Sequence, residues 1–469
     1  MTKSRDNSIT LFNNVNLGGL SEGKYQGVEY SVAAIVGLDI HAEGGTFRCQ
    51  QKLTDIDTSN IVDDFIKAKV ECSDGASYMF GSTNGKVWRR TPAGTLTQRT
   101  TIAAGVIAAK EYNGYIYYAT KNNLGRVAVP SSGYVDWSAN DDSWATFTKK
   151  DDFHPMKVLN LILYIGDGNL IAQVNGTTFT ADALDIQTPH RIKALGNYET
   201  DLLFGTYIND NVHQSQIGRW NTWSPSYAVV DDVPETGINA FLEVDNIVLV
   251  SAGEYGRLYS YNGAKLTPER RVSGDYTETK CTVHNEAVAV FKSIPLFALS
   301  QVSGNGVRYG IYSLNRTAPT YPIVSALEYI GTHGSEADVE YGAIINVPDG
   351  FLVSWKKGTD YGLDKYDATG KATGYMISRR IMIDRMNKTE YANLSVAYEE
   401  LPTGTSIKTY LARDGGAYEE FETTVDTERK IITTDVDLSE MVFGDIKLEL
   451  IPSSNDTPII QSAKLKLKN

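Results

Sequence analysis

A short two-strand pattern recurs seven times between residues 78 and 366, and it limits the fold more than any other feature. Each copy has an apolar strand, a polar turn, and a glycine that begins a second strand with aromatic or aliphatic residues. Neighbouring glycines are 38 to 56 residues apart, which is about the length of one four-stranded propeller blade. The pattern predicts an all-β fold, a seven-bladed β-propeller, although six or eight blades also fit because insertions blur the count. The seven glycines are Gly85, Gly125, Gly168, Gly218, Gly256, Gly306 and Gly362.

A separate physical reason explains the composition of each half of the pattern. The first strand is almost continuously apolar, as expected for a strand that is buried on both faces. The glycine permits either a turn with positive φ or the close approach of another group. Apolar stretches that precede several copies are predicted to be the innermost strands, namely residues 65–70, 107–112 and 238–242. A pair of β-sandwiches with evenly spaced hairpins is the alternative, but the same internal order in every copy favours the propeller.

The two ends of the chain differ from the repeat. Residues 1–29 are polar, with an apolar stripe, and are predicted to form an N-terminal arm. The propeller is expected over residues 30–373, and the alternating residues 45–53 are expected to close the ring by pairing with the last blade. Short strands with turn signals over residues 374–469 predict a small antiparallel β-sandwich.

Composition excludes several classes of protein. The formal net charge of −13 disfavours binding along a nucleic-acid backbone, which needs clustered Lys and Arg. DNA could still pass a local basic lining, without sequence-specific recognition. Three widely spaced cysteines predict neither a disulfide framework nor a Cys-x-x-Cys metal site. The sequence predicts no secretory signal and no membrane span, since it has no run of about 18 apolar residues.

A search for chemistry finds no catalytic motif, so no catalytic residue, no metal site and no cofactor is predicted, and the chain is expected not to be an enzyme. The six histidines have no zinc-binding spacing, although distant histidines could meet at the propeller axis. There is no Gly-x-Ser-x-Gly elbow and no phosphate loop. Adjacent acids are interpreted as exposed turns; the pairs are Asp63-Asp64, Asp141-Asp142, Asp151-Asp152 and Asp231-Asp232.

Aromatic residues near the predicted turns suggest a second kind of site. Trp220 and Trp223, separated by Asn-Thr, are the best candidates for stacking on a glycan. Packing between neighbouring blades is the alternative explanation, because large aromatic rings fill the wedge between sheets.

The stretch Phe12-Asn-Asn-Val-Asn-Leu-Gly-Gly-Leu20 resembles the start of tailed-phage virion proteins. In those proteins an Asn-Leu-x-Gly-Gly element precedes a small-residue stretch and a strand, like residues 31–40 here. The predicted architecture is also similar to that of the hub and nozzle proteins of short-tailed phages, which stabilise packaged DNA. The resemblance implies a homo-oligomeric ring that clamps neighbouring subunits with arms. The residues implied to dock a partner are Leu11, Phe12, Val15, Leu17 and Leu20.

Three functions follow as hypotheses. The first is a structural virion protein of a tailed phage, in the tail or head-to-tail region. It would be made in the host bacterial cytoplasm and would contact tail, portal or adaptor proteins. The second is a receptor- or carbohydrate-binding propeller at a tail tip. The third is a hydrolase with its site at the propeller axis.

Overall fold

The computed structural model describes most of the chain. The described residues are 8–13, 32–41, 45–57, 61–72, 75–130, 135–209, 212–271, 280–303, 310–316, 323–333, 338–382, 391–425, 427, 430–439 and 441–468. Among them there is no α-helix, and the one helical element is a 3₁₀ turn at Trp137–Ala139. The all-β propeller fold predicted from the sequence is confirmed. In these residues, no helix is of a length and apolarity that would carry it through a bilayer.

Most of the described strands form seven consecutive groups of four, which we call blades 1 to 7. Blade 1 has β6 (Ile66–Glu71), β7 (Ser77–Gly81), β8 (Lys86–Arg90) and β9 (Leu96–Thr101). Blade 2 has β10 (Ala108–Tyr112), β11 (Tyr115–Ala119), β12 (Asn123–Ala128) and β13 (Asp141–Thr146). Blade 3 has β14 (Met156–Leu159), β15 (Ile162–Asp167), β16 (Leu170–Asn175) and β17 (Thr178–Asp185). Blade 4 has β18 (Arg191–Tyr198), β19 (Asp201–Tyr207), β20 (Ser215–Trp220) and β21 (Ala228–Val233).

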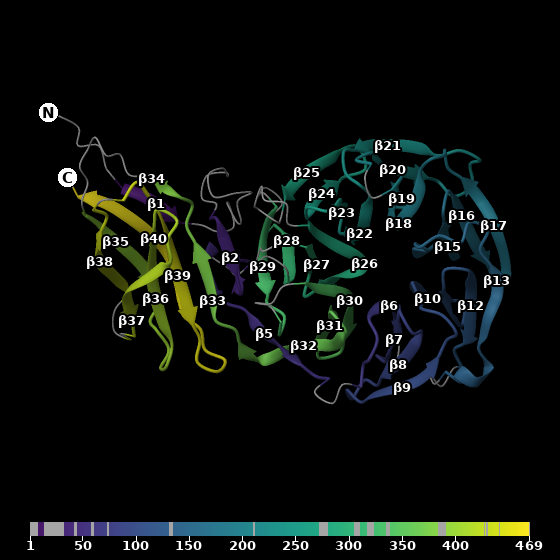
Figure 1. Cartoon of the computed structure of the whole chain (residues 1–469), viewed down its shortest axis with the longest axis horizontal. Coiled ribbons are helices and arrows are strands. Elements are labelled where there is room, and N and C mark those ends of the chain that lie inside the picture. The colour runs from purple at the N-terminus through teal and green to yellow at the C-terminus, as the bar shows by residue number, and fades with distance from the viewer. Residues whose placement is uncertain are drawn as a thin grey trace.

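The remaining blades complete the ring. Blade 5 has β22 (Ile238–Val244), β23 (Ile247–Ala252), β24 (Arg257–Tyr261) and β25 (Leu266–Arg271). Blade 6 has β26 (Lys280–Phe291), β27 (Ile294–Ser303), β28 (Gly310–Asn315) and β29 (Val324–Tyr329). Blade 7 has β30 (Val339–Val347), β31 (Gly350–Lys357), β32 (Asp360–Lys371) and β5 (Gln51–Asp55). The first strands, β6, β10, β14, β18, β22, β26 and β30, each contact the next in a closed circuit around the axis (Figure 1).

A strand from the start of the chain closes this ring. Strand β5 pairs with β32, and Leu53 lies opposite Tyr366. The expected closure by residues 45–53 is therefore right for the end of that stretch only. Its earlier part forms β4 (Phe47–Cys49), which pairs with β3 (Leu38–Asp39) and with the last strand of the chain.

The other described strands form two sheets beside the ring, which we call the two-sheet module. One sheet runs β3-β4-β40-β35-β38, and β1 also pairs with β40. The second runs β33-β39-β36-β37, and β34 also pairs with β39. Buried side chains of both sheets belong to one hydrophobic core. Its other strands are β1 (Ser8–Phe12), β33 (Gly374–Ile377), β34 (Ile381–Met382), β35 (Tyr391–Tyr398), β36 (Ser406–Arg413), β37 (Tyr418–Thr424), β38 (Ile431–Asp437), β39 (Phe443–Ile451) and β40 (Ile459–Lys468).

The boundaries predicted from the sequence change accordingly. Residues 34–49 were expected in the propeller, but their strands β2 (Ala34–Val36), β3 and β4 join the two-sheet module. The module is therefore built from both ends of the chain, because its sheets need partners that residues 374–468 alone do not supply. Its second sheet is also continuous with blade 6, since β2 pairs with β29 on one side and with β33 on the other.

The recurring glycines serve the two purposes that the sequence predicts. At Gly85 the backbone has φ of +71°, and a Cβ atom would lie 2.4 Å from the carbonyl oxygen of Ala104. At Gly125 a Cβ atom would lie 2.3 Å from the ring of Tyr118, which lies directly opposite on β11. An aromatic ring therefore occupies the space that a side chain would need. Gly306 lies outside the described residues.

Candidate functional site

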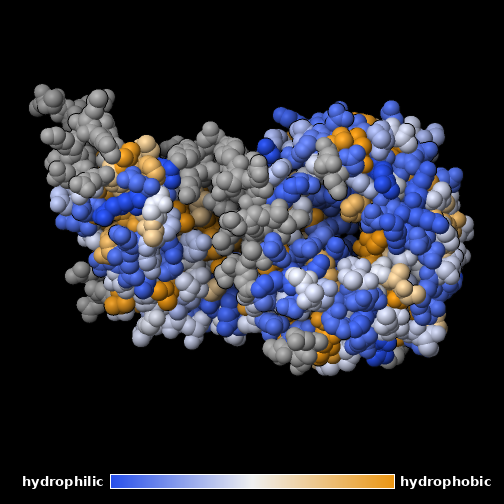
Figure 2. Space-filling model, viewed as in Figure 1, coloured by the Kyte–Doolittle hydropathy of each residue, from blue (hydrophilic) through white to orange (hydrophobic). Residues whose placement is uncertain are grey.

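The propeller axis carries the largest concentration of charged side chains among the described cavities. Strand β6 has the sequence Ile-Lys-Ala-Lys-Val-Glu, and its residues alternate between buried and partly exposed. Because side chains of a strand alternate between two faces, Lys67, Lys69 and Glu71 share one face. Lys67 lines one axial cavity, while Lys69 and Glu71 line another, and Asn285 of β26 lines both. Figure 2 shows the ring hollowed at its centre on the face in view.

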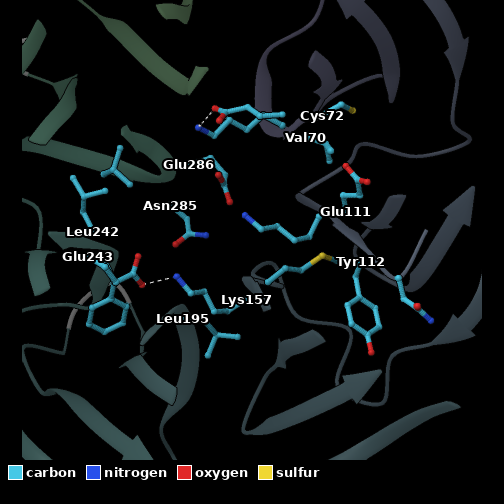
Figure 3. A pocket seen from close by; sticks show the side chains of 17 residues that line it. Val70, Cys72, Glu111, Tyr112, Lys157, Leu195, Leu242, Glu243, Asn285 and Glu286 are labelled. Carbon is cyan, nitrogen blue, oxygen red and sulfur yellow. Dashed lines mark hydrogen bonds and ion pairs between the residues drawn. The ribbon is translucent and has the colours of Figure 1, made fainter. Parts of the chain in front are cut away.

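We call the first of these the mixed-charge cavity, and Figure 3 shows its side chains. It measures about 620 Å³ and is lined by ionisable residues of both signs. Lys157 lies 2.6 Å from Glu243, and Lys69 lies 2.8 Å from Glu71. Much of the charge in this cavity is therefore neutralised within the protein. The ionisable lining residues are Lys69, Glu71, Lys110, Glu111, Lys157, Glu243 and Glu286.

We call the second the lysine cavity. It also measures about 620 Å³, and its described wall has residues from six of the seven blades and from the segment 152–155 that leads into blade 3. Four lysines line it: Lys67, Lys121, Lys193 and Lys356. The one carboxylate on its wall is that of Asp152, which pairs with Lys121.

A second carboxylate, that of Glu340, lies behind the wall of the lysine cavity. It lies 3.6 Å from Lys356 and 3.5 Å from His284. The close approach of His284, together with the charges of Lys356 and Lys67, lowers the pKa of Glu340 to about 2. Burial lowers the pKa of His284, so its imidazole is neutral at pH 7. Burial also lowers the pKa of Lys67, whose ammonium group has lost part of its water.

Two phenylalanine rings lie beneath these ammonium groups. The Nζ atom of Lys67 is 5.1 Å from the centre of the Phe65 ring, and that of Lys356 is 5.9 Å from it. The Nζ atom of Lys193 is 5.1 Å from the centre of the Phe153 ring. Cation–π attraction of this kind stabilises an ammonium group without neutralising its charge.

Two of the six histidines lie near the axis. His154 and His284 both line the lysine cavity. Both ring nitrogens of His154, however, contact carbonyl oxygens, that of Gly166 at 2.8 Å and that of Lys121 at 3.1 Å. His154 therefore links blades 2 and 3. In the part of the chain that the structure describes, no three His, Cys, Asp or Glu residues are grouped to hold a metal ion.

Two of the adjacent acids are buried, which corrects the expectation that all of them lie in exposed turns. Asp64 is 1% exposed and accepts hydrogen bonds from the backbone N–H groups of Thr83 and Asn84, at 2.9 and 2.7 Å. Asp151 is also 1% exposed and accepts a hydrogen bond from the Tyr207 hydroxyl at 2.8 Å. These carboxylates brace loops beside the lysine cavity. Their burial is compensated because donors face them.

The two candidate glycan-stacking residues are not brought together. Trp220 is 3% exposed, packs against Tyr164 between blades 3 and 4, and donates a hydrogen bond to the Ser224 carbonyl at 2.7 Å. Its proposed stacking role is therefore wrong, and blade packing explains the residue. Trp223 is 84% exposed, so it alone remains accessible to a ligand.

The candidate docking arm is also revised. Leu11 and Phe12 are buried, and the Phe12 ring packs edge-on against Phe47 with 4.6 Å between ring centres. These two side chains belong to the core of their own chain, because β1 pairs with β40. They therefore have no free surface for a partner. Val15, Leu17 and Leu20 lie outside the described residues.

The lysine cavity itself was not predicted from the sequence. The stretch of residues 65–70 was predicted as an innermost strand on its apolar residues, and the structure bears this out. The missed signal is the alternation of lysine with buried residues, at Lys67 and Lys69. A charge at such a position points into the axial space if the strand is innermost.

Comparison with known proteins gives fold likeness alone. No family model matches this chain, and no curated protein matches its sequence. Among solved structures, a streptogramin B lyase is 13% identical, with a TM-score of 0.45 over 68% of this chain and 98% of that one. A catalytically inactive virginiamycin B lyase from Staphylococcus aureus with quinupristin is 13% identical, with a TM-score of 0.44 over 67% and 99%. The N-terminal domain of Nup159 is 8% identical, with a TM-score of 0.41 over 71% and 100%. At these values the likeness carries no argument about activity.

Proposed function

We propose that this chain is a structural subunit of a larger assembly, and that the assembly is the tail or head-to-tail region of a tailed-phage particle. The observation that carries the structural role is the continuous sheet that joins blade 6 to the two-sheet module. Val36 of β2 lies opposite Leu327 of β29 and opposite Tyr375 of β33. A sheet shared by the propeller and the two-sheet module holds them in a fixed relative orientation, which suits a structural subunit.

A buried polar cluster reinforces this junction. The Nε2 atom of His41 lies 3.2 Å from Glu328 and 2.9 Å from the hydroxyl oxygen of Ser313. The side chain of Gln50 donates a hydrogen bond to the other oxygen of Glu328 at 3.3 Å. The hydrogen bonds from Gln50 to Glu328 and between His41 and Ser313 join segments that are far apart in the sequence, and such buried contacts favour one arrangement of those segments. The cluster therefore supports a fixed angle between the ring and the two-sheet module.

The far end of the two-sheet module supplies the surface for assembly. Figure 1 shows β37 and β38 at the end of the molecule away from the ring, and each is the last strand of its described sheet. Two apolar side chains at these strands are exposed: Ile431 at the start of β38 is 61% exposed, and Val425, directly after β37, is 65% exposed. An open sheet edge with exposed apolar residues is a ready template for pairing with another chain. We assign the contact between copies to this edge, in place of Leu11 and Phe12.

The phage setting rests on the resemblance of residues 12–40 and on the order of propeller and terminal sheets. It makes the neighbours of this chain other virion proteins of the tail, portal or adaptor. Mass spectrometry of purified particles checks it directly. Finding the protein at a constant ratio to the tail proteins is expected, and its absence from intact particles would overturn the setting.

The assembly role is tested by Ile431→Lys, which places a charge on the exposed edge of β38. We expect the wild-type chain to form a closed oligomer, and the variant to assemble with an affinity at least about tenfold weaker, since like charges would then meet across copies. Sedimentation velocity and negative-stain microscopy measure this.

Val229→Lys on β21 is the matched control, because Val229 is also an exposed apolar residue, 48% exposed, but lies on the outer strand of the ring. It should assemble like the wild type. A wild-type chain that stays monomeric at high concentration would count against the role, and so would equal loss of assembly in both variants.

A further inference from the structure

We propose that the lysine cavity binds a small phosphate monoester, whose phosphate group is held by Lys67, Lys193 and Lys356. Nothing in this proposal depends on the assembly role. It rests on the sign of the charge that meets in the cavity, on how that charge is partnered, and on the shape and lining of the space.

The charge balance in the cavity is positive. Glu340 interacts with Lys67, Lys356 and His284, and His284 in turn interacts with Lys193, so these groups lie within electrostatic reach of one another. Among these described groups, Lys67 and Lys356 share the single carboxylate of Glu340, which leaves one positive charge in excess. This excess occurs in a chain whose net charge is −13, so a general surplus of lysine does not explain it.

The partnering of these lysines differs from that in the mixed-charge cavity. There, Lys69 and Lys157 each have a carboxylate within 2.8 Å. Within the described residues, Lys67 has no hydrogen bond or ion pair, and its ammonium group lies over the Phe65 ring. A partly buried cation without an ion pair favours the entry of an anion, because the anion replaces lost hydration.

The chemistry favours phosphate over other anions. A phosphate monoester carries about −1.5 to −2 charges at neutral pH, so it is attracted to several ammonium groups more strongly than a singly charged anion is. Lysine binds phosphate as a point charge from any direction, whereas flat carboxylates are better matched by the fork of arginine. Arginine is absent among the residues that line the described cavity.

The rest of the lining suits the carbon part of such an ester. Phe153, Pro155 and Ile107 supply apolar surface, while Thr282 and Asn285 supply polar groups beside it. The volume of about 620 Å³ falls within the usual range of small-molecule sites, roughly 300–1,000 Å³. A phosphate with a small sugar or a similar body would occupy this space.

The test is isothermal titration calorimetry on the full chain at pH 7 and low salt, with glucose 6-phosphate, inorganic phosphate and glucose as three separate probes. We expect the two phosphates to bind and glucose not to bind. If glucose 6-phosphate binds more tightly than inorganic phosphate, the ligand is an ester and uses the apolar lining. Lys67→Met should weaken phosphate binding by about tenfold or more, as expected for loss of one charge-assisted contact, and Lys67→Arg should restore part of it.

Lys110→Met is the matched control, because Lys110 is a partly buried lysine that lines the mixed-charge cavity. It should bind phosphate like the wild type. Thermal melts confirm folding, and Lys67→Met should melt no lower than the wild type, because the cost of burying the Lys67 charge is larger than the attraction of that charge to Glu340. The proposal is overturned if phosphate does not bind up to about 10 mM, the weak end of specific binding, or if both variants lose binding equally. Equal binding of glucose and glucose 6-phosphate would overturn it too.

Discussion

The ring and the two-sheet module are both made almost entirely of strands, but they differ in the sequence separation of the strands that pair. Most pairs in the ring are close in sequence, whereas several pairs in the module are far apart. Blade 2 is complete within residues 108–146. The two-sheet module pairs Ser8 with Lys466 and joins residues 34–49 to residues 374–468. The comparison teaches that sheets of the same kind can form from residues that are close in sequence or far apart. The loss of a buried side chain should therefore disturb only nearby strands in the ring, but strands from both ends of the described chain in the module.

The largest expected effect comes from truncating one buried phenylalanine in each region. Phe47→Ala in β4 and Phe80→Ala in β7 both remove a ring that is 0% exposed, so each should lower the free energy of unfolding by about 3–5 kcal/mol. Hydrogen exchange with mass spectrometry should separate them. Phe47→Ala should expose amides in β1, β4 and β40 together, whereas Phe80→Ala should expose amides of blades 1 and 2.

Each of these variants is the control for the other, because the residue type and burial are the same. Loss of protection across the whole chain in both would break the contrast, since it would mean that ring and module unfold as one unit. Loss of protection in β4 alone would also contradict the contrast, since it would mean that the effect in the module is as local as in the ring.

A smaller effect is expected inside the ring from Gly125→Ala. The added methyl group would meet the Tyr118 ring at 2.3 Å, and forcing that ring aside should cost about 1–3 kcal/mol. Denaturant titration measures the change. The same substitution in a Tyr118→Ala background should cost much less, because the obstructing ring is gone. An equal cost in both backgrounds would show that the backbone conformation, and not the ring, requires glycine here.

The smallest effect is expected at the junction of the two regions and depends on pH. Burial raises the pKa of Glu328 from 4.5 to about 8 and lowers the pKa of His41 from 6.5 to about 4. Folded Glu328 keeps its proton between pH 4.5 and 8 while the unfolded chain releases it, so this carboxyl makes stability fall as pH rises through that window. His41 acts in the opposite direction below pH 6.5, so the loss is clearest above it.

Glu328→Gln isolates this contribution. The wild type should lose about 1–2 kcal/mol between pH 6.5 and 8, and the variant should be nearly flat over the same range. Melting temperatures across this range give the comparison. A wild-type melting temperature that does not change, or a variant that keeps the same slope, would mean that Glu328 is ionised in the folded state.

The fold of the ring could be predicted because blades 1 to 6 are each formed by residues that are close together in the sequence. Apolar strands, turn dipeptides such as Asn84-Gly85, and glycine spacing are all local signals. Short strands were also predicted over the C-terminal region, but the signal is weak at β37, because Tyr418–Thr424 carries three glutamates and little alternation. The pairing of β1 with β40 could not be predicted, because no local pattern sets the register of strands so far apart.

The candidate site also could not be predicted from local patterns in the sequence. Lys67, Lys193 and Lys356 come from blades 1, 4 and 7, and none of them stands out in its own stretch of sequence. Only closure of the ring brings them together. The aromatic candidates gave a stronger signal in the sequence, yet Trp220 is buried between blades 3 and 4. In a repeat protein, an unusual residue is most often explained within its own blade, whereas a cavity at the axis is shared by all of them.

The pairing of the first described strand with the last sets the timing of biogenesis. Strand β1 is synthesised before the other described strands, and its partner β40 ends at Lys468. At about 5–20 residues per second, roughly 20 to 90 seconds separate the emergence of the two. Strand β5 waits in the same way for β32, while blades 1 to 6 can fold as they leave the ribosome. Strands β1 and β5 are therefore the last of the described strands to be paired, and their unpaired edges are where we expect a chaperone to bind.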